Sequence, residues 1–137
     1  RQRELLSLSL IKVDGLETWL SEDAYEINCW TNQLLAVVRD VCDRTAEPVL
    51  LKPGLLALLQ PRQDRSAAVA TAKQVLHCMC RGAGGRPGSG ISLSVGVASV
   101  GVPPKNFLPE ELIRAAERCL HAAQISGGGA IKSIDIL

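Results

Sequence analysis

The chain has 137 residues, of which 47% are hydrophobic and 21% charged, so one domain can bury a substantial core. Its 15 basic and 14 acidic residues give a net charge of +1, which provides no field to attract nucleic acid or anionic lipid. No apolar run reaches the roughly 18 residues that span a bilayer, and no signal peptide is visible. We therefore expect contact with neither nucleic acid nor membrane.

The chain begins with Arg1 rather than Met, so we expect residues 1–137 to be a single domain excised from a longer multidomain protein. The five cysteines are odd in number and irregularly spaced. They fit reduced, buried thiols in a cytoplasmic protein better than a disulfide framework.

The first half of the chain predicts a strand, a helix and a hairpin. "LLSLSLIKV" at 5–13 predicts a strand that could be central in its sheet, because it alternates and then becomes mostly apolar. Apolar residues in steps of three and four predict an amphipathic helix over about 21–44, with Ser21 in the N-cap region. In "LLKPGLLALL" at 50–59, Pro53 presets φ and Gly54 allows a positive φ, which predicts a tight β-hairpin.

A second helix is expected to start near Asp64, and a strand is expected over 91–100. The glycine-rich stretch at 82–90 between them predicts a flexible connection. "ISLSVGVASV" at 91–100 alternates small polar with apolar residues, which predicts a strand with one half-buried face. The buried face of the helix is expected to carry Ala68, Ala72, Val75, Leu76 and Met79.

The last helix is expected over 108–126, with Pro109 in its first turn and glycines 127–129 as its cap. A final strand follows at 130–137. Helices interleaved with strands and a hairpin predict an α/β (α+β) sandwich, one sheet with helices packed on it. The buried stripe of this helix is expected to carry Leu112, Ala116, Cys119, Leu120 and Ala123.

Four segments resemble GGDEF domains, the diguanylate cyclase family of bacterial signalling. "SLIKVDGLE" resembles hhhDhDxFK, "LLKPGLLALLQP" resembles xLGGDEFxhhhP, and "ISLSVGVASV" resembles LTVSIGVA. "LIRAAERCLHAAQISGGGAIKSID" resembles LLxxADxALYxAKxxGxNxV. The segments follow the family's order over almost the whole chain. The resemblance implies a nucleotidyl-cyclase-like, mostly antiparallel sheet of about five strands, with the former signature motif in the hairpin.

The positions that carry the family's chemistry are changed. The five signature residues fall on Lys52, Pro53, Gly54, Leu55 and Leu56. The family has two glycines there, so that the backbone can approach GTP, and then a carboxylate for Mg²⁺, which falls on Gly54. The other metal carboxylate falls on Lys12, and Asp14 matches only an acid that is not the main ligand. Two Mg²⁺ ions would have no site, so the resemblance implies a degenerate, non-catalytic pseudoenzyme without metal or cofactor.

Other functional positions of the family also differ here. The two guanine-reading residues fall on Leu20 and Cys29, the lysine near the end of the last helix on Gln124, and the aromatic residue before it on His121. The ends of the inhibitory RxxD motif fall on Asp43 and Ala46, and "RTAE" at 44–47 is a frame-shifted near-match. The resemblance therefore implies that the inhibitory site is lost as well.

Two short motifs have competing interpretations. In "HCMC" at 77–80, His77 and Cys80 could share a helix face and bind a metal, but no second cluster supplies ligands, so a thiol packed in the core is favoured. "GAGGRPGSG" at 82–90 could suggest a phosphate loop. It lacks a GKS or GKT ending and precedes a strand, so a plain linker is favoured.

At the hairpin we expect Lys12 and Lys52 to lie close together at the sheet edge, either solvated or attracting a phosphate. One of Leu55 and Leu56 should point away from the core, unless both sheet faces are covered. Our hypothesis is that Lys52 and one of these leucines lie over a partly filled nucleotide cleft.

Two functions of different classes follow. The first is a non-catalytic signalling or interaction module that contacts other domains, a partner protein or a second copy. The second is a sensor or enzyme that binds GTP or cyclic di-GMP in the residual cleft, using Lys12, Asp14 and Lys52.

Overall fold

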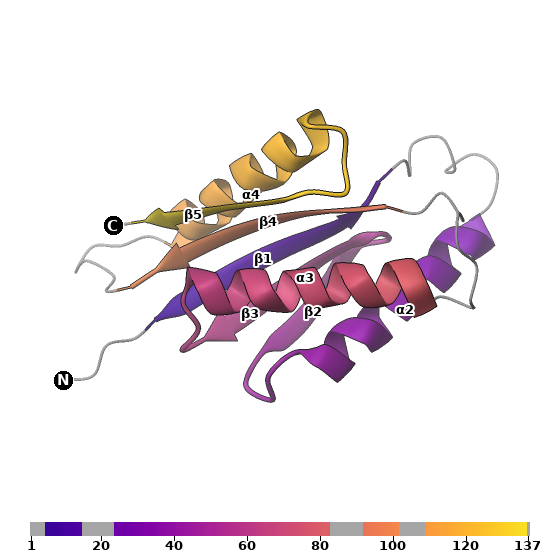
Figure 1. Cartoon of the computed structure of the whole chain (residues 1–137), viewed down its shortest axis with the longest axis horizontal. Coiled ribbons are helices and arrows are strands. Elements are labelled where there is room, and N and C mark those ends of the chain that lie inside the picture. Colours follow the sequence, from indigo (N-terminus) through magenta and orange to yellow (C-terminus); the bar gives the residue numbers. More distant parts are fainter. Residues whose placement is uncertain (1–4, 15–23, 83–91, 102–108, 137) are drawn as a thin grey trace.

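The computed structural model describes residues 5–14, 24–82, 92–101 and 109–136. Within these ranges the strands and helices follow the predicted order (Figure 1). The predicted N-cap region at Ser21 and most of the glycine-rich connection lie outside the described residues. The elements are β1 (Leu6–Val13), α2 (Ala24–Val41), β2 (Glu47–Lys52), β3 (Leu55–Pro61), α3 (Arg65–Gly82), β4 (Leu93–Val100), α4 (Pro109–Ile125) and β5 (Ile131–Ile136).

The five strands form one sheet in the order β2-β3-β1-β4-β5. Strand β1 is central, as expected, and pairs antiparallel with both β3 and β4. Strands β2 and β3 are also antiparallel, whereas β4 and β5 are parallel. The sheet is therefore mixed and mostly antiparallel, and β2 and β5 are its two edges.

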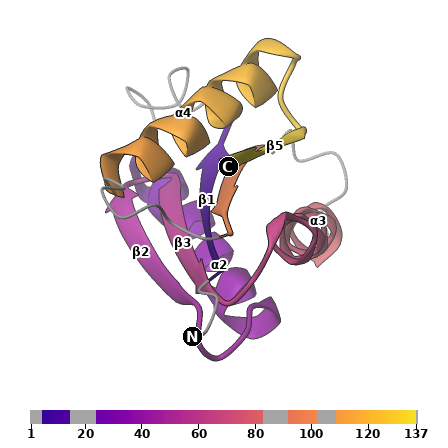
Figure 2. The ribbon, with the colours of Figure 1, turned by 90° about the vertical axis from the view of Figure 1, so that its left-hand side faces the viewer.

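Helices cover both faces of the sheet (Figure 2). Helix α4 packs on one face, and α2 and α3 pack on the other. Because side chains alternate along a strand, β1 sends Ile11 and Val13 into the core under α2 and α3, and Leu8 and Leu10 into the core under α4. Both cores consist mainly of Leu, Val, Ile and Ala, as the scarcity of aromatic residues requires.

The prediction for β4 is wrong in one respect, because this strand is buried on both faces and not on one. The reason is that α4 covers one of its faces while residues of α3 reach the other. Its polar residues are accommodated by hydrogen bonds, since Ser94 donates to Asp14 and the hydroxyl of Ser99 bonds that of Ser7. At Gly96 the backbone of α4 approaches so closely that a Cβ would collide with Leu120 N and Ala116 O.

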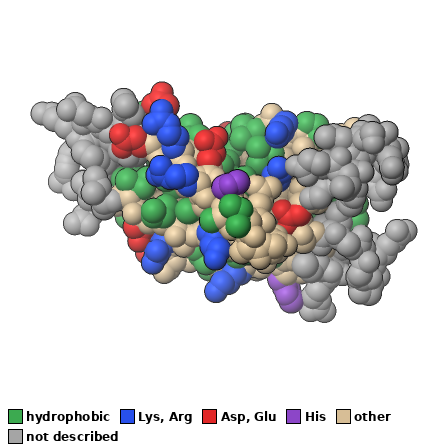
Figure 3. Space-filling view, turned by 90° about the horizontal axis from the view of Figure 1, so that it is seen from above, with side chains coloured by type: hydrophobic (Ala, Val, Ile, Leu, Met, Phe, Trp, Pro, Cys, Tyr) green, Lys and Arg blue, Asp and Glu red, His purple; other side chains and the backbone are tan. Residues whose placement is uncertain are grey.

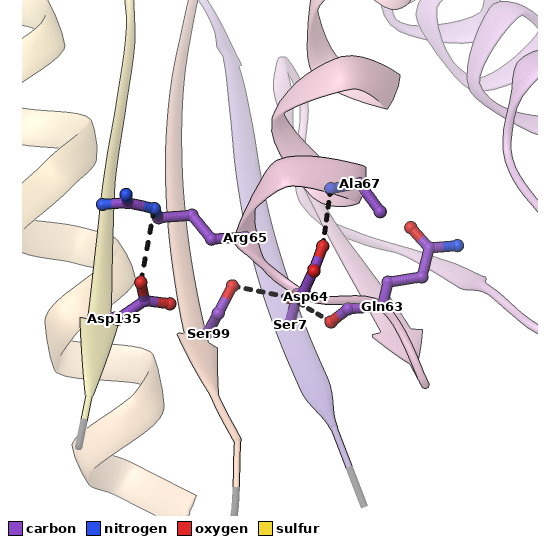
Figure 4. Close-up of polar contacts among 7 residues, drawn as sticks. All are labelled: Ser7, Gln63, Asp64, Arg65, Ala67, Ser99 and Asp135. Carbon is purple, nitrogen blue, oxygen red and sulfur yellow. Dashed lines mark hydrogen bonds and ion pairs between the residues drawn. The ribbon is translucent and has the colours of Figure 1, made fainter.

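A buried polar cluster joins β1, β4 and the start of α3 (Figure 4). The Ser7 hydroxyl donates to the Gln63 carbonyl at 2.7 Å and lies 2.6 Å from the Ser99 hydroxyl, which therefore donates to Ser7. The start of α3 near Asp64 is confirmed, because Asp64 Oδ1 accepts the Ala67 N–H at 2.9 Å as an N-cap does. An exposed ion pair between Arg65 and Asp135, 3.4 Å apart, lies nearby.

Helix α4 has the predicted buried stripe, with Ala115 in addition. Its predicted glycine cap is also confirmed, because Gly127, Gly128 and Gly129 all have positive φ and the Gly128 N–H donates to the Ala123 carbonyl at 3.2 Å. None of the helices in the described ranges is long and apolar enough to cross a membrane.

The prediction that the thiols are buried is confirmed for only some of the described cysteines. All four cysteines in the described side chains are free, but Cys29 is exposed and Cys78 is half-buried. Cys119 is buried, and burial raises the pKa of its thiol. Burial also raises the pKa of the half-buried Cys42, helped by the negative charge of the neighbouring Asp43.

Candidate functional site

The hairpin between β2 and β3 has the predicted geometry. Lys52 pairs with Leu55, and Gly54, at the second central position of the turn, has a φ of 85°. With Pro53 before it, this fits a type II turn. The Gly54 carbonyl accepts the Val13 N–H at 2.9 Å, so the tip of the hairpin is held against the end of β1.

Four residues form a row across the sheet beside this tip. Lys52 pairs with Leu55, Leu55 pairs with Lys12, and Lys12 pairs with Ser94. Paired residues point to the same face, here the face of α4, and the two lysine backbones are about 10 Å apart because neighbouring strands are separated by about 4.8 Å. Lys52 is exposed and Lys12 is half-buried. The register therefore places the two lysines on either side of Leu55, close together as expected.

Leu55 and Leu56, which the resemblance aligns with the end of the family's signature, point to opposite faces. Leu56 is fully buried in the core beneath α2 and α3, and Leu55 packs half-buried against the core beneath α4. The alternative in which both faces of the sheet are covered therefore applies, and neither leucine projects freely into solvent.

Asp14 receives three hydrogen-bond donors at the end of β1. Ser92 donates to Oδ2 and Ser94 to Oδ1, both at 2.7 Å, and the Gly129 N–H donates to Oδ2 at 3.3 Å. The Asp14 N–H also donates to the Ser92 carbonyl at 2.9 Å. The carboxylate thus joins the end of β1, the start of β4 and the turn that follows α4, and hydrogen bonds to a charged acceptor are the stronger kind.

Gln124 and His121 lie on the last two turns of α4. Gln124 is half-buried, and its carbonyl accepts the Gly127 N–H at 3.1 Å, in the same turn that reaches Asp14. His121 is exposed in a shallow groove together with Arg114, Arg118 and Ile125. On the face of the molecule seen from above, the described side chains are a mixture of basic, acidic and apolar groups (Figure 3).

Asp43 and Ala46, which the resemblance aligns with the ends of the inhibitory motif, lie in the turn between α2 and β2. The Asp43 carboxylate accepts the Arg44 N–H at 2.9 Å and the Thr45 hydroxyl at 2.8 Å, and the Asp43 carbonyl accepts the Ala46 N–H at 3.0 Å. Asp43, Arg44 and Thr45 are exposed. Of the two guanine-reading positions, Cys29 is exposed on α2, and Leu20 lies outside the described residues.

The metal interpretation of "HCMC" gains no geometric support. His77 is exposed and Cys78 half-buried on α3, while the side chain of Cys80 is not among those described. Across the described ranges, no group of three or more His, Cys, Asp and Glu side chains is arranged to hold a metal ion.

The sequence interpretation missed the partners of Asp14. The alternating pattern identifies Ser92 and Ser94 only as polar residues of a strand, although they supply two of the three donors. Their spacing of two residues was a usable signal, since it places both hydroxyls on the same face of the chain.

No protein-family model matches the chain, and a search of curated proteins finds no match. Solved structures do match. The GGDEF domain of DgcB from Caulobacter crescentus, in complex with c-di-GMP, has a TM-score of 0.79 at 12% identity, covering 95% of this chain and 78% of that one. The active GGEEF domain of a diguanylate cyclase from Vibrio cholerae has a TM-score of 0.79 at 13% identity, covering 94% and 82%.

A third similar structure contains a protein partner. The diguanylate cyclase SiaD from Pseudomonas aeruginosa, in complex with its activator SiaC, has a TM-score of 0.79 at 15% identity, covering 95% of this chain and 50% of that one. The chain therefore has the fold of GGDEF domains, as the sequence resemblance implies.

Proposed function

We propose that this chain is a non-catalytic GGDEF-fold module of cyclic di-GMP signalling that acts in the bacterial cytoplasm by contacting other domains or a partner protein. The observation that carries the proposal is the juxtaposition of Lys12 and Gly54. Lys12 pairs with Leu55, the residue after Gly54, and the neighbouring Val13 bonds the Gly54 carbonyl. By the sequence resemblance, these are the two positions at which the family holds metal carboxylates, and this chain has a cation and a glycine there.

Asp14, the remaining acid of the site, already accepts hydrogen bonds from within the chain. Each Asp14 oxygen accepts a serine hydroxyl, and one also accepts a backbone N–H. Catalysis would need two Mg²⁺ ions to neutralise the charge that develops on the triphosphate. A single carboxylate held in this way leaves those ions far short of the oxygen ligands that they require. If the chemistry is lost while the fold is retained, the chain acts through binding, and SiaD with SiaC is an example of this fold with a protein partner.

The test is an overnight reaction with GTP and Mg²⁺ or Mn²⁺, followed by chromatography. The Vibrio cholerae GGEEF domain, run in parallel, verifies the assay. We expect no cyclic di-GMP above the blank without protein. Product clearly above that blank would contradict the proposal.

A nucleotide sensor is the second candidate, and the row Lys52–Leu55–Lys12 favours it. Two cations about 10 Å apart could bind a polyphosphate without a metal. Against this, the tip has a single glycine, and Pro53 has no N–H to offer a phosphate.

A thermal-shift titration with GTP, ATP and cyclic di-GMP separates the two candidates. A nucleotide at a hundred times its dissociation constant adds about 2.7 kcal/mol to the free energy of unfolding. The first candidate predicts no shift with GTP or ATP. A saturable shift that Lys52→Ala abolishes would favour the sensor.

A further inference from the structure

The edge strand β2 exposes an apolar surface. Val49, Leu50 and Leu51 are 49%, 46% and 54% exposed, and Leu59 of β3 is 41% exposed. Side chains of this kind and size are normally buried, and an edge strand also carries backbone groups without a ladder partner. Strand β2 is the outermost strand of the sheet on this side (Figure 2), so a further strand can be added beside it.

The two ends of β2 carry opposite charges on the same face. Glu47 pairs with Leu59 and Lys52 pairs with Leu55, and these β3 residues are four positions apart, so both point to the face of α4. In a regular strand, residues five positions apart point to opposite faces. The register shift between Leu50 and Lys52 changes this alternation, so Glu47 and Lys52 point to the same face.

We propose that β2 is a self-association surface, on which β2 of a second copy of this chain pairs antiparallel about a two-fold axis. Val49 then lies opposite Val49 of the second copy, and Pro48 lies opposite Leu50. With the register shift included, Glu47 lies opposite Lys52, and symmetry repeats this oppositely charged pair at the other end. Cross-strand pairs of opposite charge stabilise a ladder, and like charges destabilise it.

Pro48 and the oppositely charged residues at the two ends of β2 favour this register over others. A strand proline keeps its nitrogen on the side away from its ladder, so Pro48 and Leu50 turn their free backbone groups outward. The Leu50 N–H can then donate to the Pro48 carbonyl of the second copy, twice by symmetry. A slip of one residue would place paired side chains on opposite faces, and a slip of two would separate Glu47 from Lys52.

The association is expected to be weak and reversible. A stable interface buries about 800 Å² on each partner, and one six-residue strand provides less than that. The two sheets nevertheless join into one continuous sheet, with the exposed apolar residues of both copies side by side. The surface involves no nucleotide and does not depend on the proposed function.

The experiment is sedimentation velocity of the whole chain from low micromolar to near-millimolar concentration. We expect a reversible shift from monomer to dimer. Glu47→Lys alone and Lys52→Glu alone should each weaken dimerisation by about tenfold, because each turns two attractive pairs into repulsive ones. The double variant Glu47→Lys/Lys52→Glu restores opposite charges and should regain dimerisation.

Two further variants make the result specific. Lys132→Glu makes the same charge change on β5, the opposite edge, and should leave dimerisation unchanged. Val49→Lys places two like charges at the centre of the pairing and should abolish it. All of these positions are exposed, so circular dichroism should show native folding. A monomer at every concentration would overturn the proposal, as would a dimer that the β2 variants leave intact or that Lys132→Glu weakens.

Discussion

Asp14 illustrates how an acid can persist for structural reasons at a position where a resemblance suggests chemistry. Its carboxylate accepts three hydrogen bonds, two of them from serines at 92 and 94, and the Ser94 side chain is fully buried. A donor that loses its acceptor in a buried place costs more than an ordinary hydrogen bond contributes. The residue therefore has a measurable role in stability whatever the chain binds.

We expect Asp14→Ala to lower the free energy of unfolding by about 1–3 kcal/mol, because Ser92, Ser94 and Gly129 lose their common acceptor. Urea unfolding followed by circular dichroism measures the change. Asp43→Ala is the control, since Asp43 also accepts two hydrogen bonds but lies exposed in a turn. Equal losses for the two variants would show that Asp14 does not hold the three segments together.

Restoring the signature alone should not restore catalysis. We expect Lys52→Gly, Pro53→Gly and Gly54→Glu together to produce no cyclic di-GMP. In the resemblance to the family, Lys12 still stands at the position of the other metal carboxylate, and the parts of a site act non-additively. Chromatography of the GTP reaction is the measurement. Gly54 has a φ of 85°, which strains any other residue, so the variant must first be shown to fold. Activity would mean that Lys12 does not match the metal carboxylate.

At the scale of elements, the position of α4 depends on one glycine of β4. A Cβ at Gly96 would overlap the helix backbone at Leu120 and Ala116, and backbone atoms give way only if the whole helix moves. A methyl group at Gly101, at the end of the same strand, would meet only the flexible Leu5 side chain at 3.9 Å.

Gly96→Ala should therefore destabilise the fold by about 3 kcal/mol or more, at the upper end of the cost of overpacking a core. Gly101→Ala makes the same chemical change and should alter stability by less than about 0.5 kcal/mol. Thermal unfolding of the two variants provides the comparison. If both melt like the parent chain, α4 does not pack against Gly96 as described.

Elements whose signals are local could be predicted from sequence. The stripe of α4 follows from a spacing of three and four residues, and the hairpin follows from Pro53-Gly54. The full burial of β4 could not be predicted. Alternation along a strand shows which residues lie on each face, but it does not show whether a second layer of helices covers the more polar face. The Asp14–Ser92 contact spans 78 positions and has no local signature. The neighbourhood of Lys12 and Lys52 was predictable only through the family resemblance.

At the scale of the whole molecule, two thiols should make stability sensitive to alkaline pH. Burial raises the pKa of the Cys42 and Cys119 thiols, so the folded chain holds these protons more tightly than the unfolded chain does. Their contribution is fully present below the unfolded pKa and disappears as pH rises through the folded pKa. It should therefore be constant between pH 6 and 8 and fall above about pH 9.

Urea midpoints between pH 7 and 10.5 test this expectation. The double variant Cys42→Ala/Cys119→Ala should lose less stability between pH 8 and 10.5 than the parent chain does. The two proteins differ only at these two cysteines, so the difference between the two slopes isolates the thiols. Identical slopes would mean that neither thiol has a raised pKa.

The central place of β1 has a consequence for synthesis of the chain. Strand β1 is made before both of its neighbours, and Ser7 meets Ser99 only after 92 further positions have been translated. At about 5–20 residues per second this takes roughly 5–18 s. Strand β3 emerges first and can pair with one edge of β1, while the other edge stays open until β4 leaves the ribosome. During that interval Leu8 and Leu10 lack the packing that β4 and α4 later provide, so the nascent chain exposes apolar surface of the kind that chaperones bind.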